Sequence, residues 1–207
     1  MTEESYKQLV ERMIENDAAS PMISSDTGVE AARKAGQLAA QEEIEWAVAG
    51  GLAMHFYGSP RMTKDVDIIA SENLSLTPQH KLTFGGSSYR LQAGKYAVQI
   101  DWIVRSDGYK EFYRRALKEA IGLPNGLRVV TPEWLVILKF NAGRQKDLDD
   151  IVFLLKQEKL VDRSTVKEKI VETAGEGGWL TMMSGFRRLC DLADGQTKEP
   201  GKYYDQD

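Results

Sequence analysis

One stretch of the chain, residues 46–69, decides the fold and reads WAVAGGLAMHFYGSPRMTKDVDII. It opens with an apolar run that has the length of a short buried strand, and Gly50-Gly51 ends that run. Residues 52–57 have the composition of a short helix, and a loop signal follows them. The β-branched run at residues 66–69 predicts a second strand. The stretch therefore predicts a strand, a short helix and a second strand, in that order.

The other strand signals end at residue 104, and helix signals lie on both sides of them. Apolar and aromatic residues at 89–91 and 96–104 predict a hairpin that turns near Gly94. Two helices are expected after the caps Thr131 and Asp147, the first weakening at Gly143. Helical spacing predicts further helices at residues 3–17, 26–43 (capped by Asp26-Thr27), 109–121, 163–174 and 179–194. The fold class is therefore α+β, with a small mixed sheet flanked by helices and a helical C-terminal region.

The same patterns divide the chain into four segments. Residues 1–43 form an N-terminal helical segment, and residues 44–130 form a core that contains the strands. Residues 131–194 form a C-terminal helical region. Residues 195–207 have no periodicity, so we expect them to be a disordered tail.

The composition excludes several classes of protein. The net charge of −4, from 27 Lys and Arg against 31 Asp and Glu, argues against coating nucleic acid through bulk charge. The longest uncharged stretch, Trp46 to Pro60, is shorter than the ~20 apolar residues of a membrane-spanning helix. The single cysteine, Cys190, excludes an internal disulfide and a cysteine metal cluster, and the two histidines, His55 and His80, are too few for a His-rich zinc site. We expect a cytoplasmic protein without a signal peptide, in which carboxylates hold any metal.

Three aspartates form the candidate chemical centre. Asp65 and Asp67 flank Val66, so alternation places both carboxylates on one face of a strand, roughly 6.6 Å apart between Cα atoms. Carboxylates at that separation can converge on two cations ~3.5–4 Å apart. Asp101 lies in an apolar strand, where an unpaired charge is costly. If that strand pairs beside residues 65–70, the three carboxylates form one cluster. Each observation alone has a simpler explanation. An Asp-x-Asp pair is common at the edge of a strand, and an isolated Asp101 would pair with a surface arginine.

Glycines and basic residues accompany these carboxylates. Gly50-Gly51, fourteen residues before Asp65, would leave backbone amides open to a phosphate. Three cations in an eight-residue segment supply the charge that a polyphosphate requires, and they are Lys139, Arg144 and Lys146. Taken alone, Lys139 would be explained as a snorkelling side chain. Asp147 and Asp150 would hold Arg144 or Lys146 in place. A second basic group on one predicted helix consists of Arg114, Arg115 and Lys118. A solvent-exposed helix face is the simplest explanation for this group.

Two strings carry a family resemblance that covers about residues 44–156. GGLAMHFYGSPRMTKDVDII at residues 50–69, with Asp101 on a later strand, resembles the nucleotidyltransferase superfamily of DNA polymerase β. TPEWLVILKFNAGRQKDLDDI at residues 131–151 resembles the Leu-Lys-x-x-Ala-x-Arg-x-Lys-Asp-x-x-Asp block of the AbiEii-type abortive-infection nucleotidyltransferases. The resemblance implies a nucleotidyltransferase fold, with its core at residues 44–130.

The resemblance also implies an activity: an enzyme moves a nucleoside monophosphate from an NTP to an acceptor hydroxyl and releases pyrophosphate. Asp65 and Asp67 would bind two Mg²⁺ ions, with Mn²⁺ as a substitute. Asp101 would hold the catalytic metal and help to deprotonate the hydroxyl. The implied nucleotide-binding residues are Gly50 and Gly51 at the phosphates, and Lys139 with Arg144 and Lys146 at the triphosphate. Independently of the resemblance, the loop at residues 58–64 is a candidate for the nucleotide entrance, with Arg61 and Thr63 as its binding residues. The alternative for Thr63 is a hydrogen bond from its hydroxyl to the loop backbone.

Toxins of this family modify tRNA ends and are paired with an antitoxin, so tRNA and a cognate antitoxin are the implied partners. A transferase acting on a small hydroxylated molecule such as an aminoglycoside is the alternative enzyme. A non-catalytic antitoxin or binding module with the same fold is the alternative outside enzymes. The three intact carboxylates argue against the second alternative.

Overall fold

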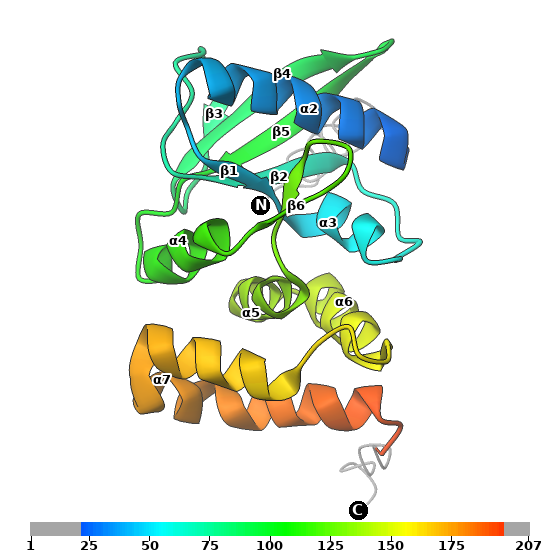
Figure 1. Ribbon diagram of the computed structural model, residues 1–207, viewed down its shortest axis with the longest axis vertical. Coiled ribbons are helices and arrows are strands. Elements are labelled where there is room, and N and C mark those ends of the chain that lie inside the picture. The colour runs from blue at the N-terminus through cyan, green and yellow to red at the C-terminus, as the bar shows by residue number, and fades with distance from the viewer. Residues whose placement is uncertain (1–21, 197–207) are drawn as a thin grey trace, which may run out of the picture. The chain divides into compact units, whose positions relative to one another are not determined.

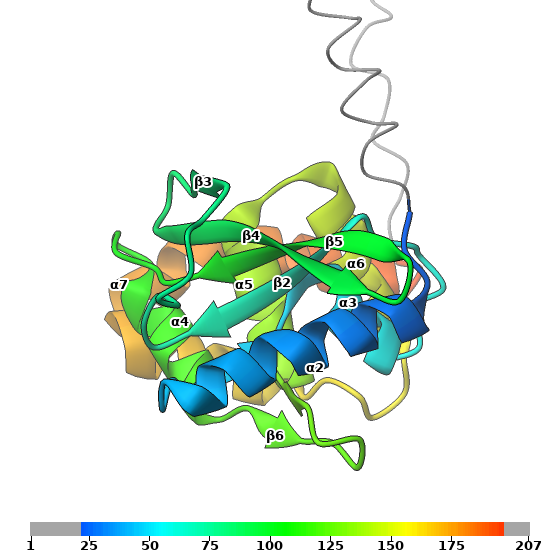
Figure 2. The same cartoon turned by 90° about the horizontal axis from the view of Figure 1, so that it is seen from above.

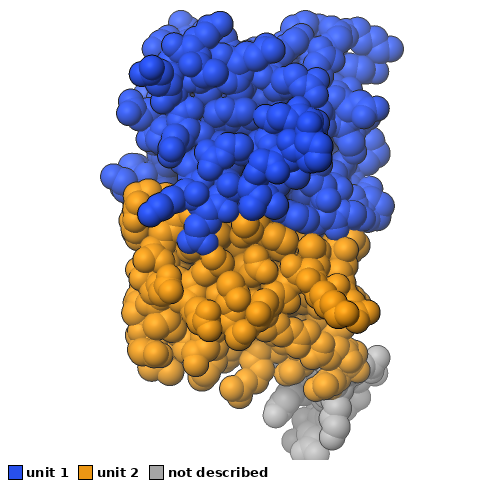
Figure 3. Space-filling view, viewed as in Figure 1, with its two compact units in different colours: residues 1–110, 117–130 blue, residues 111–116, 131–207 orange. Residues whose placement is uncertain are grey.

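The computed structural model describes residues 22–196 as an α+β fold with a seven-stranded mixed sheet, which confirms the expected fold class. The helix expected at residues 3–17 and the tail beyond residue 196 lie outside the described residues. The chain forms two compact units, coloured separately in Figure 3. The first comprises the described residues up to Lys110 together with Leu117–Val130, and the second comprises Glu111–Ala116 and the described residues from Thr131.

The first unit contains the whole sheet (Figure 1). Its strands lie in the order β3-β4-β5-β2-β1-β7-β6. β1 pairs with β7 and β2 pairs with β5 in parallel, whereas all other neighbours are antiparallel. The strands are β1 Trp46–Val48, β2 Asp65–Ala70, β3 His80–Lys81, β4 Gly86–Ala93, β5 Tyr96–Ile103, β6 Ile121–Gly122 and β7 Arg128–Val129.

The strands expected at residues 46–49 and 66–69 and the hairpin at Gly94 are present as β1, β2 and β4–β5. Ala93 pairs with Tyr96, and Gly94 adopts a φ of 54°, the left-handed conformation that a two-residue turn requires. The sequence analysis missed β3, β6 and β7, which have only two residues each. Such strands are too short to show alternation.

Three helices begin or end differently from the expectation. α2 spans Ser25–Gln41 and is capped by the Ser24 hydroxyl, not by Asp26-Thr27. α3 spans Gly50–Phe56, so the double glycine forms its first turn and does not only end the strand. α4 spans Lys110–Lys118 and stops before residue 121, which belongs to β6.

α2 covers one face of the sheet (Figure 2). A Cβ added to Gly36 of α2 would overlap the indole of Trp46 on β1, which shows how closely the helix backbone approaches the strand. Because Trp46 pairs with Ala70, α2 lies on the face that carries Val66 and Ile68, both fully buried. The opposite face carries the odd-numbered residues of β2.

The second unit contains α5 Pro132–Ala142, α6 Gln145–Lys156 and α7 Arg163–Ala193, which pack on one another. α5 ends at Gly143, whose φ of 66° is the left-handed C-cap conformation. α7 is interrupted at Gly175 (φ 72°, ψ 177°), which confirms the two separate helices expected in this region. Arg163 and Asp194, at the two ends of α7, form a bidentate ion pair with distances of 2.8 and 2.5 Å, so the two halves fold back on each other.

Of the two caps expected in this unit, Thr131 is confirmed as the N-cap residue of α5, with Pro132 at the start of the helix, whereas the cap at Asp147 is wrong. The Thr131 hydroxyl precedes α5 but makes no capping bond, and its oxygen is buried without a partner among the described residues. The N-cap residue of α6 is Arg144, so Asp147 lies inside the first turn and binds cations there. No helix between residues 22 and 196 is both long and apolar enough to cross a membrane.

Replacing Gly36 by Ala tests the contact between α2 and the sheet. Overpacking against Trp46 should lower the free energy of unfolding by about 1–3 kcal/mol, despite the higher helix propensity of alanine. Gly177→Ala is the matched control, because Gly177 lies in α7 with open space around it and should gain up to about 1 kcal/mol. Chemical denaturation of both variants gives the comparison. A gain in stability for both would mean that α2 does not approach Trp46 closely.

Candidate functional site

The face of the sheet opposite α2 carries all three candidate aspartates. The parallel register of β2 and β5 pairs Asp65 with Gln99 and Asp67 with Asp101. Paired residues on neighbouring strands point to the same side, so the strand of Asp101 does lie beside residues 65–70 as the cluster requires. The hairpin register adds residues from β4 and β3 to this side. We call it the carboxylate face. Its polar members near the aspartates are Asp65, Asp67, His80, Ser88, Arg90, Gln99 and Asp101, and Gln92 lies farther along β4.

The loop before β2 orients Asp65. The Thr63 hydroxyl donates to the Asp65 carboxylate Oδ1 and to the Asp65 carbonyl, both at 3.0 Å. Thr63 is only 6% exposed, and its carbonyl accepts from the backbone N–H of Ile23 at 2.9 Å. Within residues 22–196 no hydrogen bond ends on Asp65 Oδ2. One oxygen of Asp65 is therefore held in place while the other is available to a ligand.

Asp101 is oriented in the same way by its neighbours on the sheet. The Ser88 hydroxyl donates to Asp101 Oδ1 at 2.9 Å, and Gln99 Nε2 donates to the same oxygen at 3.0 Å. No described residue bonds to Asp101 Oδ2. A carboxylate with one oxygen fixed by hydrogen bonds and the other available is the arrangement that neighbouring groups give to metal ligands.

Asp67 and the double glycine lie against each other. A Cβ added to Gly50 would overlap the Asp67 carboxylate, and Gly50 has a φ of 55°, so both sterics and backbone conformation require glycine there. A Cβ on Gly51 would come within 2.6 Å of the Thr63 hydroxyl oxygen. The two glycines therefore make room for the side chains of the carboxylate face, which is a structural reason for them beside the predicted phosphate contact.

The donor set of this face suits Mg²⁺, which prefers oxygen ligands. No three acidic, histidine or cysteine side chains in the described part of the chain are placed to hold a metal ion alone. In nucleotide-dependent sites, however, Mg²⁺ is bound by one or two carboxylates together with phosphates, not by an all-protein cage. The available oxygens of Asp65 and Asp101 therefore fit a Mg²⁺ ion that arrives with a nucleotide.

Arg61 lies in a loop that is tied to α3 and α2. Its carbonyl is hydrogen-bonded to His55 Nε2, and the Ser25 hydroxyl bonds to His55 Nδ1 at 2.5 Å. The backbone N–H of Arg61 donates to the Ser59 hydroxyl at 3.3 Å. These hydrogen bonds fix the loop, and both ring nitrogens of His55 are used in them. A nucleotide contact from Arg61 or Thr63 stays a prediction.

Lys139 forms a buried ion pair in the second unit. Its Nζ lies 2.6 Å from Asp150 Oδ2 and 3.4 Å from Asp147 Oδ1, and its side chain is 6% exposed. The lysine does not snorkel to solvent, and its ammonium is neutralised by two carboxylates. This pairing gives Lys139 a structural role, and its predicted contact with a triphosphate stays a prediction.

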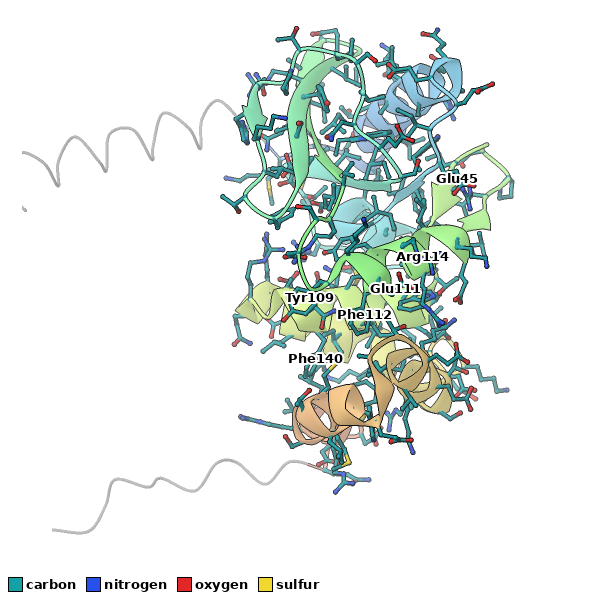
Figure 4. All side chains as sticks on the ribbon, turned by 90° about the vertical axis from the view of Figure 1, so that its left-hand side faces the viewer. Glu45, Tyr109, Glu111, Phe112, Arg114 and Phe140 are labelled. Atoms are coloured by element: carbon teal, nitrogen blue, oxygen red, sulfur yellow. The ribbon has the colours of Figure 1, made fainter. Side chains whose placement is uncertain are left out.

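The remaining predicted cations also have defined surroundings. Arg144 donates to Asp147 through Nε at 2.6 Å, as the sequence suggested, and its side chain is 62% exposed. Lys146 is exposed on α6. On α4, Arg114 pairs with Glu111 (Figure 4) and Arg115 pairs with Glu172. These carboxylate partners favour the solvated-face explanation for the second basic group.

Sequence analysis missed four residues of the carboxylate face: Ser88 and Gln99, which orient Asp101, and His80 and Arg90 beyond them. The sequence does contain the information that places residues 88, 90 and 99 on this face. A hairpin with a two-residue turn at Gly94-Lys95 pairs residue 88 with 101 and residue 90 with 99. His80 could not be found this way, because β3 is only two residues long.

No family model and no curated protein matches this sequence. The structure is similar to the crystal structure of an antigenic nucleotidyltransferase-like protein from Paracoccidioides brasiliensis, with 16% identity, a TM-score of 0.47, and coverage of 86% of this chain and 97% of that one. It is also similar to the solution structure of the antibiotic-resistance factor ANT(2'')-Ia, with 11% identity, a TM-score of 0.36, and coverage of 83% and 97%. At these identities and TM-scores the likeness carries no conclusion about function, which depends on the chain's own residues.

Replacing Lys139 by Met tests the ion pair, because Met keeps the length of the side chain and removes the charge. Asp147 and Asp150 would remain buried without that cation, so we expect the free energy of unfolding to fall by about 3–5 kcal/mol. Urea denaturation at neutral pH measures the change. Lys146→Met, at an exposed lysine of the same segment, should change stability by less than about 0.5 kcal/mol. Equal stability of the two variants would contradict a structural role for Lys139.

The same cluster predicts a pH dependence. Burial raises the pKa of the Asp147 carboxyl, but hydrogen bonds from Arg144 and the charges of Lys139 and Arg144 outweigh burial and hold the pKa below its usual value. The stabilisation is therefore complete above the unfolded-state pKa of about 3.9 and is lost as the pH falls through the lower folded-state pKa. Asp147→Asn should thus lose less stability than the wild type between about pH 6 and pH 3 in urea denaturation. An unchanged pH slope in this variant would refute the assignment.

Proposed function

We propose that this chain is a metal-dependent nucleotidyltransferase that moves a nucleoside monophosphate from an NTP to an acceptor hydroxyl. The observation that carries the proposal is the register that pairs Asp67 with Asp101 and brings Asp65 to the same face of the sheet. Three carboxylates on one face repel one another unless a cation joins them. The available oxygens of Asp65 and Asp101 are suited to such a cation.

In the proposed reaction, the acceptor oxygen forms a bond to the α-phosphorus of the NTP. The bond from that phosphorus to the oxygen bridging to the β-phosphate breaks, and pyrophosphate leaves. Mg²⁺, when bound, would neutralise the charge that builds up on the phosphate oxygens. Asp65, Asp67 and Asp101 would hold the metal together with the phosphates, and the Asp101 carboxylate would help to deprotonate the acceptor hydroxyl.

The residues around the aspartates would serve as positioning groups. Ser88 and Gln99 donate hydrogen bonds to Asp101 Oδ1, which leaves Oδ2 available. Thr63 does the same for Asp65. Because these bonds are fixed before substrate binds, little reorganisation would be needed in the transition state.

The proposal includes assignment of the chain to the AbiEii-type branch of nucleotidyltransferases, whose toxins modify tRNA ends and are paired with an antitoxin. The sequence from Leu138 to Asp150 supports this branch, since it resembles the Leu-Lys-x-x-Ala-x-Arg-x-Lys-Asp-x-x-Asp block. On this basis the acceptor would be a tRNA end and the partner an antitoxin. A small hydroxylated molecule is the other acceptor that this chemistry allows.

Incubation with each α-labelled NTP, Mg²⁺ and total RNA tests the activity. Label should be transferred in a Mg²⁺-dependent way, and Asp67→Asn or Asp101→Asn should lower the rate by about 100-fold or more through loss of transition-state charge stabilisation. Both variants should also lose the rise in melting temperature that Mg²⁺ with NTP gives the wild type.

Asp26→Asn is the matched control, because Asp26 is an exposed aspartate of the same unit at the start of α2. It should keep both the activity and the thermal shift. If Asp67→Asn and Asp26→Asn behave alike in both assays, the carboxylate face is not the site of the reaction.

A further inference from the structure

His55, near the end of α3, is hydrogen-bonded both to the first turn of α2 and to the loop before β2. The Ser25 hydroxyl oxygen lies 2.5 Å from His55 Nδ1, and His55 Nε2 is hydrogen-bonded to the Arg61 carbonyl. A carbonyl oxygen can only accept, so Nε2 carries the proton and Nδ1 of the neutral ring is an acceptor. The Ser25 hydroxyl therefore donates to a ring nitrogen, which is the arrangement in which a base activates a serine.

The Arg61 carbonyl takes the place that a carboxylate has in many serine–histidine sites. It fixes the tautomer and the orientation of the ring, and it would stabilise the imidazolium that forms when the serine gives up its proton. Arg61 is itself held, because its backbone N–H donates to the hydroxyl of the buried residue Ser59. A nucleophile, a base and an orienting group thus form one hydrogen-bonded chain inside the first unit.

The packing of α2 on α3 sets the distance between Ser25 and His55. Gly28 is buried and lies three residues after Ser25. A Cβ added to Gly28 would be 3.0 Å from Leu52 Cδ1, and Leu52 lies three residues before His55. The Ser24 hydroxyl also caps α2 directly before the nucleophile. The two side chains are therefore positioned before any substrate arrives.

Ser25 is also accessible to a substrate. The residue is exposed, and a hydrogen bond from an exposed hydroxyl competes with water and adds little to stability. The backbone N–H groups of Ser25 and Asp26 have no acceptor among residues 22–196, because they belong to the first turn of α2. A carbonyl oxygen bound beside Ser25 Oγ would find hydrogen-bond donors there.

We propose that Ser25 and His55 form a second catalytic site, which hydrolyses small, uncharged carboxylic esters and is independent of the proposed nucleotidyl transfer. Ser25 Oγ forms a bond to the carbonyl carbon, its proton passes to His55 Nδ1, and the electrons of the C=O bond move to the oxygen. When the carbonyl re-forms, the ester C–O bond breaks and the alcohol leaves with the proton from His55. Water then attacks the acyl-serine in the same way, which releases the carboxylic acid and restores Ser25.

The neighbouring charge selects the class of ester. Asp26 follows the nucleophile directly, is exposed, and forms no ion pair with a described residue. Its carboxylate repels anionic substrates such as phosphate monoesters. An uncharged carboxylic ester carries no such penalty, and only its transition state develops the negative charge that the two backbone donors can meet.

Labelling with a fluorophosphonate, which reacts with activated serines and releases fluoride, tests the nucleophile. In the presence of EDTA the wild type should take up label on the peptide that contains Ser25. Ser25→Ala should lose this label. Ser106→Ala should keep it, because Ser106 is an exposed serine of the same unit whose hydroxyl bonds to no described histidine. No label on the wild type, or equal labelling of wild type and Ser25→Ala, would overturn the proposal.

Hydrolysis of p-nitrophenyl acetate tests the base. The wild type should release a burst of nitrophenol as the acyl-serine accumulates, and Ser25→Ala should show no burst. His55→Gln keeps an N–H group for the Arg61 carbonyl but offers no base, so the burst rate should fall by about 100-fold or more. The melting temperature of each variant checks its fold. Ser25→Ala changes only an exposed hydroxyl, so it decides the question even where His55→Gln is unstable.

Two results in this assay would contradict the proposal. A wild-type burst rate in folded His55→Gln would mean that the bond between Ser25 and His55 only fixes the loop. Loss of the wild-type burst on addition of EDTA would assign the hydrolysis to a metal site, since the proposed steps use only the serine, the histidine and water. Nucleotidyl transfer, in contrast, should stop when EDTA removes Mg²⁺.

Discussion

The parallel pairing of β2 with β5 is the constraint on which the candidate site depends. It sets Asp67 directly opposite Asp101 and leaves Asp65 one residue pair away on the same side. Because side chains alternate along a strand, a shift of the register by one residue would turn Asp101 to the face that α2 covers. The fully buried residues Val66, Ile68, Ile100 and Trp102 oppose such a shift, since they would have to leave the core. The apolar face of the sheet thus fixes the geometry of the polar one.

Glycine makes this arrangement of charges sterically possible. The chain that leaves β1 passes so close to β2 that no side chain fits at Gly50, where the Asp67 carboxylate lies. Gly51 makes room in the same way for Thr63, which in turn holds Asp65. The Thr63 hydroxyl holds one oxygen of Asp65, and the Ser88 hydroxyl and the Gln99 amide hold one oxygen of Asp101. Neither aspartate forms an ion pair with a described residue. Carboxylates that lie close together repel one another and cost stability, and this cost is expected where a site is kept ready for a ligand.

The sequence predicted those parts of the fold whose signals are local. β1, β2, the β4–β5 hairpin, and the breaks at Gly143 and Gly175 follow from apolar runs, turn residues and glycine. Thr131 was correctly predicted as the N-cap residue of α5, although its hydroxyl makes no capping bond. The cap at Asp147 was wrong, because ion pairs with Arg144 and Lys139 decide where the Asp147 side chain lies. The two-residue strands gave no periodic signal. For the candidate site, the three aspartates were found by type and spacing. The pairing of Asp67 with Asp101 is a contact between distant segments that no local pattern contains.

Lys139 has two possible roles, phosphate binding and a structural ion pair, and its burial in the structure distinguishes between them. A lysine, an arginine and two aspartates close together in sequence resemble a polyphosphate-binding segment. In the structure they neutralise one another, with Lys139 and both aspartates almost fully buried. A buried ion pair gives little net stability compared with apolar residues, but it makes the loss of one partner costly. Arg144 is the member of the cluster that extends into solvent, so a role in binding would begin with Arg144, positioned by Asp147, and Lys139 would act through that carboxylate.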